Sequence, residues 1–124
     1  MTDLTTRYLG LDLRSPIVAS ASPLNKEPAT ARLVEEAGAS ALVLPSLFEE
    51  EILHEDIELN RSLEVGAGHG AEAAGYFPTV EAFATVGDRY LARLEAIKAQ
   101  ASVPVIASLN AFSTGCWTRY ARLI

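Results

Sequence analysis

Three short apolar runs are spaced along the chain, and each ends at small polar residues. The runs cover 17–19, 41–44 and 103–107, and they lead into 20–22, 45–46 and 108–110. Strands of a parallel sheet that are buried on both faces have this continuous apolar character. The pattern therefore predicts three parallel strands, over 17–20, 41–44 and 103–109. Their carboxyl-terminal ends would bring the polar residues to one rim.

Helical periodicity fills the intervals between these runs. A helix is predicted from Pro28 to a stop at Gly38, since proline suits a first turn and glycine a helix end. A second helix is predicted over 48–63, with its acidic residues on a solvated face. A third is predicted over 88–100, and a last one follows a cap at Ser113 or Thr114. The apolar stripes expected on these helices are Leu33, Val34 and Ala37; Phe48, Ile52 and Leu59; Tyr90, Leu91, Leu94 and Ile97; and Trp117, Tyr120, Ala121 and Ile124.

Two further segments complete the predicted organisation. Residues 8–13 read as a small hairpin that turns at Gly10. Residues 65–87 are rich in glycine and alanine and are predicted to form a long functional loop. Strands that alternate with helices define an α/β fold. The chain has 124 residues, whereas a complete βα barrel needs about 250.

Composition narrows the classes of function. The formal net charge is −6, with eight arginines and two lysines scattered along the chain, so no basic patch indicates nucleic-acid binding. No apolar run approaches the roughly 20 residues of a membrane span, and no signal-peptide pattern begins the chain. Cys116 is the only cysteine, which fits a reducing compartment. A cytoplasmic protein that meets a small-molecule substrate is the expectation.

Most single motifs have a simpler structural explanation. Gly66, Gly68 and Ala71 fit the spacing of a dinucleotide fingerprint, but the preceding segment is helical and polar, so a flexible loop is favoured. His54 and His69 lack partners at metal-site spacing. Cys116 near a helix start suggests a nucleophile, yet no neighbouring histidine offers a base, and a partly buried structural thiol is favoured.

The polar residues at the strand ends are the strongest functional signal. Ser22, Ser46, Ser108 and Asn110 come from three different strands and are expected at one rim. Hydroxyl and amide groups in such a place suit the polar edge of a cofactor. The alternative is that they cap the following helices.

These segments, in their order, resemble class 1 dihydroorotate dehydrogenase and its dihydroorotate dehydrogenase-like relatives. The similarity covers nearly the whole chain, in the segments 8–11, 15–18, 21–23, 36–39, 46–50, 104–110, 117, 120–121 and 123–124. The resemblance implies an FMN-dependent (β/α)₈ barrel that oxidises dihydroorotate to orotate in pyrimidine biosynthesis. By position it implies flavin contacts at Ala21, Ser22 and Ser46, and at Ser108 or Asn110.

The same resemblance identifies departures from the family. Pro45 stands where the family has a lysine that contacts flavin and substrate, and 66–78 lacks the family's paired asparagines. The family's catalytic cysteine or serine and its phosphate-binding loops come later than Ile124. The chain is therefore expected to be the N-terminal part of such a barrel, about three βα units, inactive alone.

Two alternatives remain open. A non-enzymatic remnant or a half-barrel that associates with itself would follow from unpaired strand edges and uncovered apolar surface. Another flavin barrel, of the dihydropyrimidine or dihydrouridine type, would share the cofactor and differ in substrate.

Overall fold

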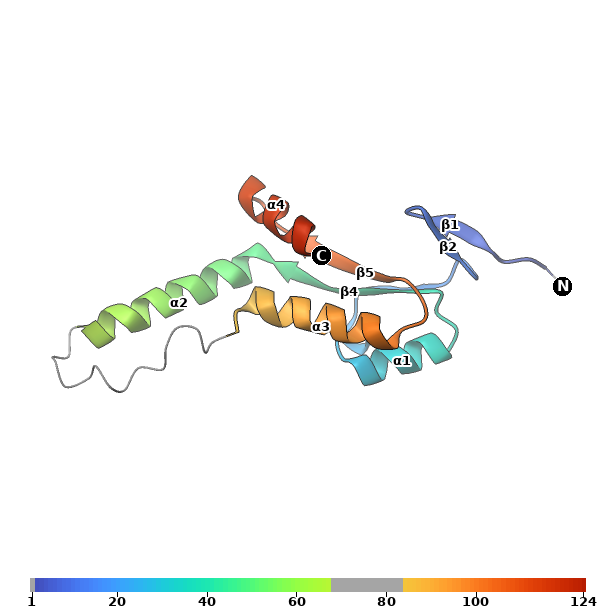
Figure 1. Ribbon diagram of the computed structural model, residues 1–124, viewed down its shortest axis with the longest axis horizontal. Coiled ribbons are helices and arrows are strands. Elements are labelled where there is room, and N and C mark those ends of the chain that lie inside the picture. The colour runs from blue at the N-terminus through green and yellow to red at the C-terminus, as the bar shows by residue number, and fades with distance from the viewer. Residues whose placement is uncertain (1, 68–83) are drawn as a thin grey trace.

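The computed structural model describes residues 2–67 and 84–124 of the chain. Its elements run along a mixed α/β chain (Figure 1). In sequence order they are β1 (Thr6–Tyr8), β2 (Leu11–Leu13), β3 (Val18–Ala19), the 3₁₀ turn η1 (Pro23–Asn25), α1 (Pro28–Glu36), β4 (Ala41–Phe48), α2 (Glu49–Ala67), α3 (Val86–Gln100), β5 (Val105–Asn110) and α4 (Thr114–Leu123).

The predicted parallel strands are confirmed. β3, β4 and β5 form one sheet in that order, and both strand pairs are parallel. α1 connects β3 to β4, and α2 and α3 lie between β4 and β5 in the sequence. Figure 1 shows α1 and α3 along the same side of β4, while α2 extends away from the sheet. Three strands in an open row form no closed barrel within the described part of the chain.

The predicted hairpin before the sheet is also confirmed. β1 and β2 pair antiparallel, with Tyr8 opposite Leu11. The two residues of the turn, Leu9 and Gly10, have φ angles of +52° and +78°. Positive φ at both central positions matches the right-handed twist of the flanking strands, and glycine adopts it without strain.

β4 is longer than the apolar run predicted. It continues through Pro45 to Phe48, so the helix expected from Phe48 begins at Glu49 instead. Val43 pairs with Ile106 and Ser46 pairs with Ser108, which leaves Leu44 and Pro45 opposite the single residue Ala107. This β-bulge is a place where a strand tolerates proline, because the missing amide breaks no regular ladder.

The bulge also sets which side chains enter the core. One extra residue changes the alternation of β4, so Leu42, Leu44 and Leu47 all pack on the side that α1 and α3 cover. All three are fully buried. Ser46 and Ser108 then lie together on the opposite face.

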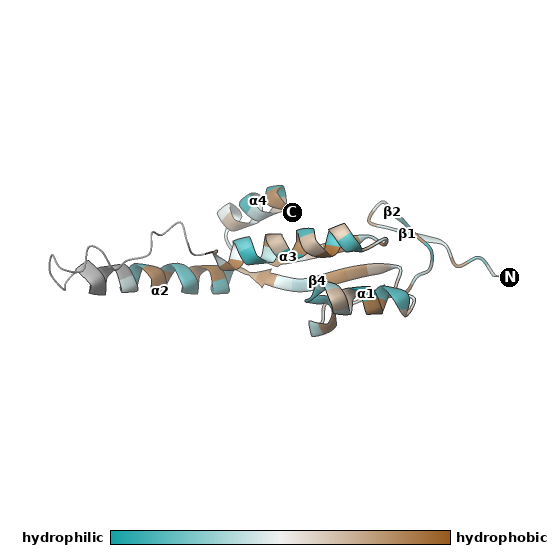
Figure 2. Cartoon of the chain, turned by 60° about the horizontal axis from the view of Figure 1, so that its bottom comes forward, coloured by the Kyte–Doolittle hydropathy of each residue, from teal (hydrophilic) through white to brown (hydrophobic). Residues whose placement is uncertain are grey.

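Two hydrophobic clusters form the core on the covered side. The first joins α1, β4 and α3 through Ala31, Ala39, Leu42, Leu44, Leu94 and Ile97. The second joins β4, α3 and α4 through Leu47, Tyr90 and Tyr120. Figure 2 shows hydrophobic colouring on parts of β4, the strand that α1 and α3 cover. Burial of this surface is the main favourable contribution to folding.

The helices lie where they were predicted, but the residues that they bury differ from the predicted apolar stripes. Pro28 opens α1, and Gly38, with φ +114°, follows its end as expected. Leu33, however, is 63% exposed, and Ala31 takes the buried position in its place. On α4 only Tyr120 is buried, whereas Trp117 and Ile124 are exposed. An apolar residue on a short helix is buried only where a neighbour covers it, and these helices are covered along narrow strips.

Candidate functional site

A pocket of about 660 Å³ opens along β4 beyond the end of β3. β3 pairs with β4 only at Ala41 and Leu42, so the rest of β4 on that side has no strand beside it in the described structure. Residues from both faces of β4 therefore reach the same hollow. The lining comes from η1 and its flanks, β4, the start of α2 and the first turns of α3: Ala21, Ser22, Pro23, Lys26, Pro45, Ser46, Leu47, Phe48, Glu51, Val86, Arg89, Tyr90 and Arg93.

Three of the five predicted cofactor contacts line this pocket. Ala21 and Ser22 come from the end of β3, and Ser46 comes from the end of β4. The Ser108 hydroxyl lies 2.7 Å from that of Ser46, so it reaches the pocket residues through a hydrogen bond. Asn110 pairs with Phe48 at the end of β5 and is exposed, and it does not line the pocket. The strand ends thus bring four of the five residues together.

Asn25 holds the end of β3 against β4. Its side chain is 1% exposed, and its Nδ2 donates to the carbonyls of Ser20 and Val43, each at 2.9 Å. These bonds satisfy backbone acceptors at the point where the strand ladder stops. Asn25 therefore fixes the segment that carries Ala21 and Ser22 relative to β4.

Tyr90 forms the floor between α3 and the sheet. Its hydroxyl donates to the carbonyl of Ser108 at 3.0 Å and accepts from the amide of Ser108 at 2.9 Å. Burial raises the pKa of Tyr90, and the Ser108 bond and the charge of Arg93 only partly oppose the effect. The phenol therefore stays protonated at neutral pH and keeps both hydrogen bonds to β5.

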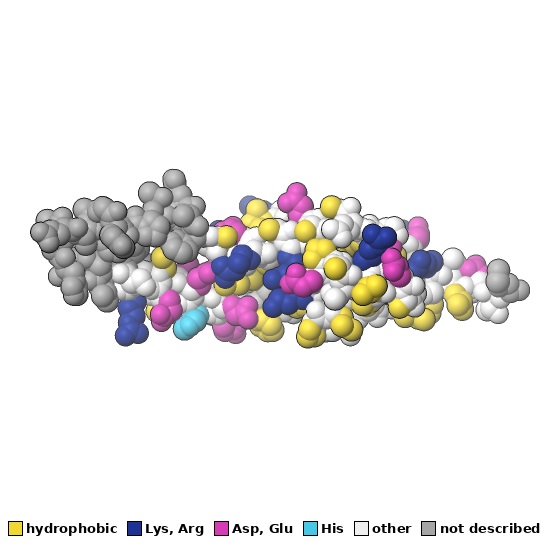
Figure 3. Space-filling model, turned by 90° about the horizontal axis from the view of Figure 1, so that it is seen from below, with side chains coloured by type: hydrophobic (Ala, Val, Ile, Leu, Met, Phe, Trp, Pro, Cys, Tyr) yellow, Lys and Arg dark blue, Asp and Glu magenta, His cyan; other side chains and the backbone are white. Residues whose placement is uncertain are grey.

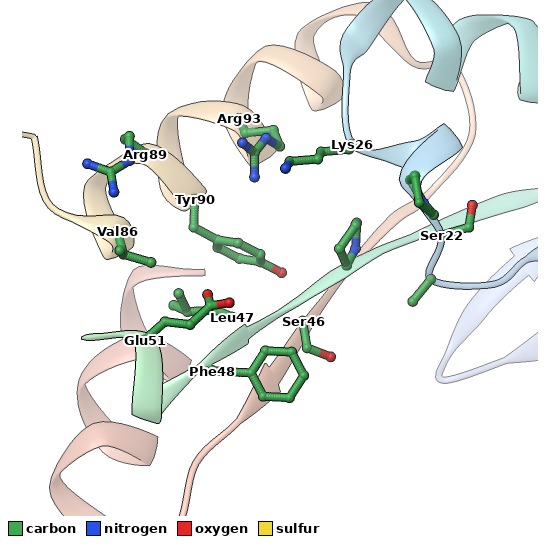
Figure 4. Close-up of a pocket in the computed structure, with 13 residues that line it drawn as sticks. Ser22, Lys26, Ser46, Leu47, Phe48, Glu51, Val86, Arg89, Tyr90 and Arg93 are labelled. Carbon is green, nitrogen blue, oxygen red and sulfur yellow. The ribbon is translucent and has the colours of Figure 1, made fainter. Parts of the chain in front are cut away.

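Charged side chains divide the pocket into two ends. Figure 4 shows Lys26 and Arg93 pointing toward each other at the η1 end, while Glu51 lies at the α2 end near Leu47. Arg89 is turned away from this pair, and its guanidinium donates to Glu55 at 3.1 Å. Figure 3, seen from the side of α1 and α3, shows Lys and Arg side chains gathered over the middle of that face.

Sequence reasoning missed these pocket residues. Lys26 lies just beyond the polar residues that follow the first strand, and Arg93 occupies a polar position on a predicted helix. Only the first of these positions carries a sequence signal, because residues after a strand end are expected at the rim. The position of Arg93 depends on how α3 packs on the sheet.

The acidic run at the start of α2 was wrongly predicted to be a solvated face throughout. Glu49 is 5% exposed, and its carboxylate accepts from the amides of Phe112 and Ser113 at 2.6 and 2.8 Å and from the Ser113 hydroxyl. Burial raises the pKa of Glu49, but the bonds from Ser113 and Phe112 outweigh it and hold the pKa below its ordinary value. Glu49 therefore ties α2 to the N-terminus of α4.

Glu55 makes the equivalent connection to α3. Its carboxylate accepts from the Val86 amide and from Arg89. Thr85 and Asp88 complete this N-terminus with a reciprocal capping box. Carboxylates are favoured here because the first amides of a helix lack partners and carry a partial positive charge. Glu49 and Glu55 thus fix the N-termini of α4 and α3 against the first turns of α2.

The remaining motif predictions fall on other parts of the chain. Gly66 lies inside α2 and does not follow a strand, so the context of a dinucleotide fingerprint is missing. Gly68, His69, Ala71 and most of the predicted 65–87 loop lie outside the described residues. Cys116 is half-buried, as predicted. Burial and the charge of Glu49 raise the pKa of its thiol, which opposes a nucleophilic role.

Two kinds of feature are absent from the described ranges. No three side chains of the types His, Cys, Asp and Glu within 2–67 and 84–124 gather closely enough to hold a metal ion. In the same ranges no helix has both the length and the apolar character that a membrane crossing requires.

Comparisons of the chain with protein-family models, with curated proteins and with solved structures find no match. What this site can bind is therefore inferred from its own geometry. That geometry is a pocket with apolar walls, hydroxyl groups at the strand ends, two converging cations and a carboxylate at the far end. It can hold a planar or elongated small molecule that is polar at its ends.

Proposed function

We propose that this pocket and the adjoining rim bind FMN in an oxidoreductase similar to dihydroorotate dehydrogenase. The supporting observation is that Ala21, Ser22 and Ser46, which the sequence resemblance selects as flavin contacts, line one pocket although 23 residues or more separate Ser46 from the other two. The carboxyl-terminal ends of parallel strands are the usual place for such a ligand.

The pocket residues fit the chemistry of a flavin. Pro23, Pro45 and Phe48 supply apolar walls suited to the ring system, and the hydroxyls of Ser22 and Ser46 suit its polar edge. Lys26 and Arg93 supply positive charge, which stabilises the negative charge of a reduced flavin. When bound, FMN supplies the hydride acceptor, and these residues hold and orient it.

We further propose that residues 1–124 alone have no dehydrogenase activity. Pro45 replaces the family's lysine with a side chain that carries neither charge nor donor. The family's base and phosphate-binding loops have no counterpart in the printed sequence. Measurable turnover of dihydroorotate by the purified 124-residue chain would contradict this proposal.

Flavin binding is tested directly by fluorescence. Riboflavin, which lacks the phosphate, and FMN are titrated with the chain, and we expect saturable quenching of both. Ser46→Leu fills the pocket and removes the bond to Ser108, so we expect it to weaken binding by about tenfold or more. Ser62→Leu, on an exposed position of α2, is the matched control. Absence of quenching, or equal quenching by the two variants, would refute flavin binding here.

Self-association is the second candidate function. β5 is an end strand of the sheet in the described structure, and Phe112 and Trp117 beyond it are 69% and 44% exposed. Open edges and exposed aromatic side chains favour association. Size-exclusion chromatography with light scattering tests this candidate. A flavin-free dimer would favour self-association over the flavin proposal, and a monomer at all concentrations would refute self-association.

A further inference from the structure

We propose that the η1 end of the pocket is a binding site for an oxyanion, the phosphate or carboxylate group of a small metabolite, held between Lys26 and Arg93. This inference goes beyond flavin binding. Neither residue is among the flavin contacts that the sequence resemblance implies, and the ligand is defined by its charged group alone, whether or not it is a flavin.

The first support is the direction of the two side chains. Lys26 follows η1 and Arg93 lies on α3, yet both line the same pocket and their nitrogen atoms point toward each other (Figure 4). Two positive groups that converge repel each other, and an anion between them converts that repulsion into attraction. Lysine and arginine together also supply several N–H donors for phosphate or carboxylate oxygens.

The second support is the distribution of carboxylates around them. Within the described residues, neither Lys26 nor Arg93 forms an ion pair. Arg89, one turn before Arg93, is already engaged by Glu55. Among the lining residues that the structure describes, Glu51 is the only carboxylate, and it lies at the other end of the pocket. Among these lining residues the charge at the η1 end is therefore positive, on a chain whose net charge is −6.

The third support is the rigidity of the frame that holds the two cations. Asn25, directly before Lys26, is buried and bonded to the carbonyls of Ser20 and Val43. Arg93 lies between the buried residues Tyr90 and Leu94 on α3. The backbone positions of both cations are therefore fixed, and less of the chain has to be ordered when a ligand binds.

The opposite end of the pocket adds a constraint on the ligand. Glu51 accepts hydrogen bonds and repels anions, so it selects a molecule whose far end carries donors such as hydroxyl or amine groups. Pro45 and Phe48 add apolar surface to the lining of the same pocket. A compact metabolite with an anionic head and a donor-bearing tail matches all three parts.

The test is an NMR titration of the full 124-residue chain with inorganic phosphate and, separately, with acetate, against sodium chloride at equal ionic strength. We expect saturable shifts of the amides around Lys26 and Arg93 with at least one of the two anions. Lys26→Gln and Arg93→Gln each remove a charge-assisted contact, so we expect binding to weaken about tenfold. Lys98→Gln makes the same charge change at the other end of α3 and should leave binding unchanged.

The two anions separate the possible sources of the charged group. Saturation with phosphate alone identifies a phosphorylated ligand, saturation with acetate alone identifies a carboxylate, and both outcomes support an oxyanion site. Shifts that do not saturate, or equal weakening by Lys98→Gln, would overturn the inference. Thermal melts of each variant show whether it is folded. Phosphate binding without riboflavin quenching would refute only the flavin proposal. Riboflavin quenching without binding of either anion would refute only the oxyanion site.

Discussion

The two faces of the three-stranded sheet differ in how far their side chains are removed from water. On the face covered by α1 and α3, Leu42 and Leu44 are 0% exposed, whereas Phe48 on the opposite face is 39% exposed. The opposite face also carries the Ser46–Ser108 hydroxyl pair. The difference indicates that one face supplies the stability of the fold, while the other face and the strand ends are free to carry polar chemistry.

The largest expected effect comes from truncating a core residue on the covered face. Leu42→Ala removes fully buried atoms between α1, β4 and α3, and we expect a loss of about 2–5 kcal/mol in the free energy of unfolding. Ile106→Ala removes the same number of carbons from a half-buried position on the opposite face. Urea unfolding of both variants measures the difference, and equal losses would contradict the distinction between the faces.

The next effect tests the contact between α3 and α4 at the end of the covered face. A Cβ added at Gly87 would lie 2.0 Å from the hydroxyl oxygen of the buried Tyr120. Gly87→Ala must displace that ring, and we expect a loss of about 1–3 kcal/mol. Gly115→Ala, in α4, meets nothing within 4 Å and should stabilise the helix by roughly 0.5–1 kcal/mol. Thermal melts of the two variants should therefore shift in opposite directions.

The third effect concerns the buried Glu49, the first residue of α2 after β4. Its pKa is lower in the folded chain than its ordinary value, so its contribution to stability is complete above about pH 5 and declines as the pH falls through the folded pKa. Glu49→Gln removes the charge that caps α4, and we expect a lower Tm at pH 7 together with a weaker loss of stability on acidification. Melts from pH 7 to pH 3 provide the measurement.

Glu50→Gln is the matched control for this prediction. Glu50 neighbours Glu49 on α2 but is exposed, so its substitution should leave the pH dependence of Tm unchanged. An identical pH profile for both variants would show that the buried carboxylate has no special role.

The smallest effect is expected on the opposite face. Ser46→Ala removes the hydroxyl that bonds to Ser108 at 2.7 Å, in a partly exposed position. A hydrogen bond of this kind contributes about 0.5–1.5 kcal/mol, and water replaces part of it. We expect a loss of about 1 kcal/mol or less in urea unfolding. A loss as large as that of Leu42→Ala would show that this face is also part of the core.

The sequence predicted the positions of helices and strands more accurately than it predicted which residues are buried and what they contact. The apolar runs located all three parallel strands, and Gly10, Pro28 and Ser113 marked the hairpin, the start of α1 and the cap of α4. The end of β4 was missed, because the run of apolar residues is interrupted by Pro45. A bulge opposite Ala107 accommodates that proline, and no local pattern in β4 reveals the register of its partner strand.

The candidate site likewise contains residues that the local sequence pattern predicted and residues that only the packing of the helices placed there. Ser22 and Ser46 could be predicted at the rim because each follows a strand-forming run, and strand ends of a parallel sheet face one edge. Arg93 could not be predicted, since helical periodicity gives its face on α3 but not the element that this face meets. The burial of Glu49 was missed for a related reason. Glu50 and Glu51 are the same type of residue, and only the contact with the start of α4 makes Glu49 buried.

The amino-acid sequence by itself determined the α/β class, the order of the elements, the parallel strands and the polar residues that end them. These features depend on local propensity and periodicity, which are properties of neighbouring residues along the chain. The tertiary structure alone decided that the β4 bulge returns Leu47 to the core, that Glu49 is buried, and that Lys26 and Arg93 point toward each other. These features depend on contacts between segments far apart in the sequence, whose energies are set only when the helices pack on the sheet.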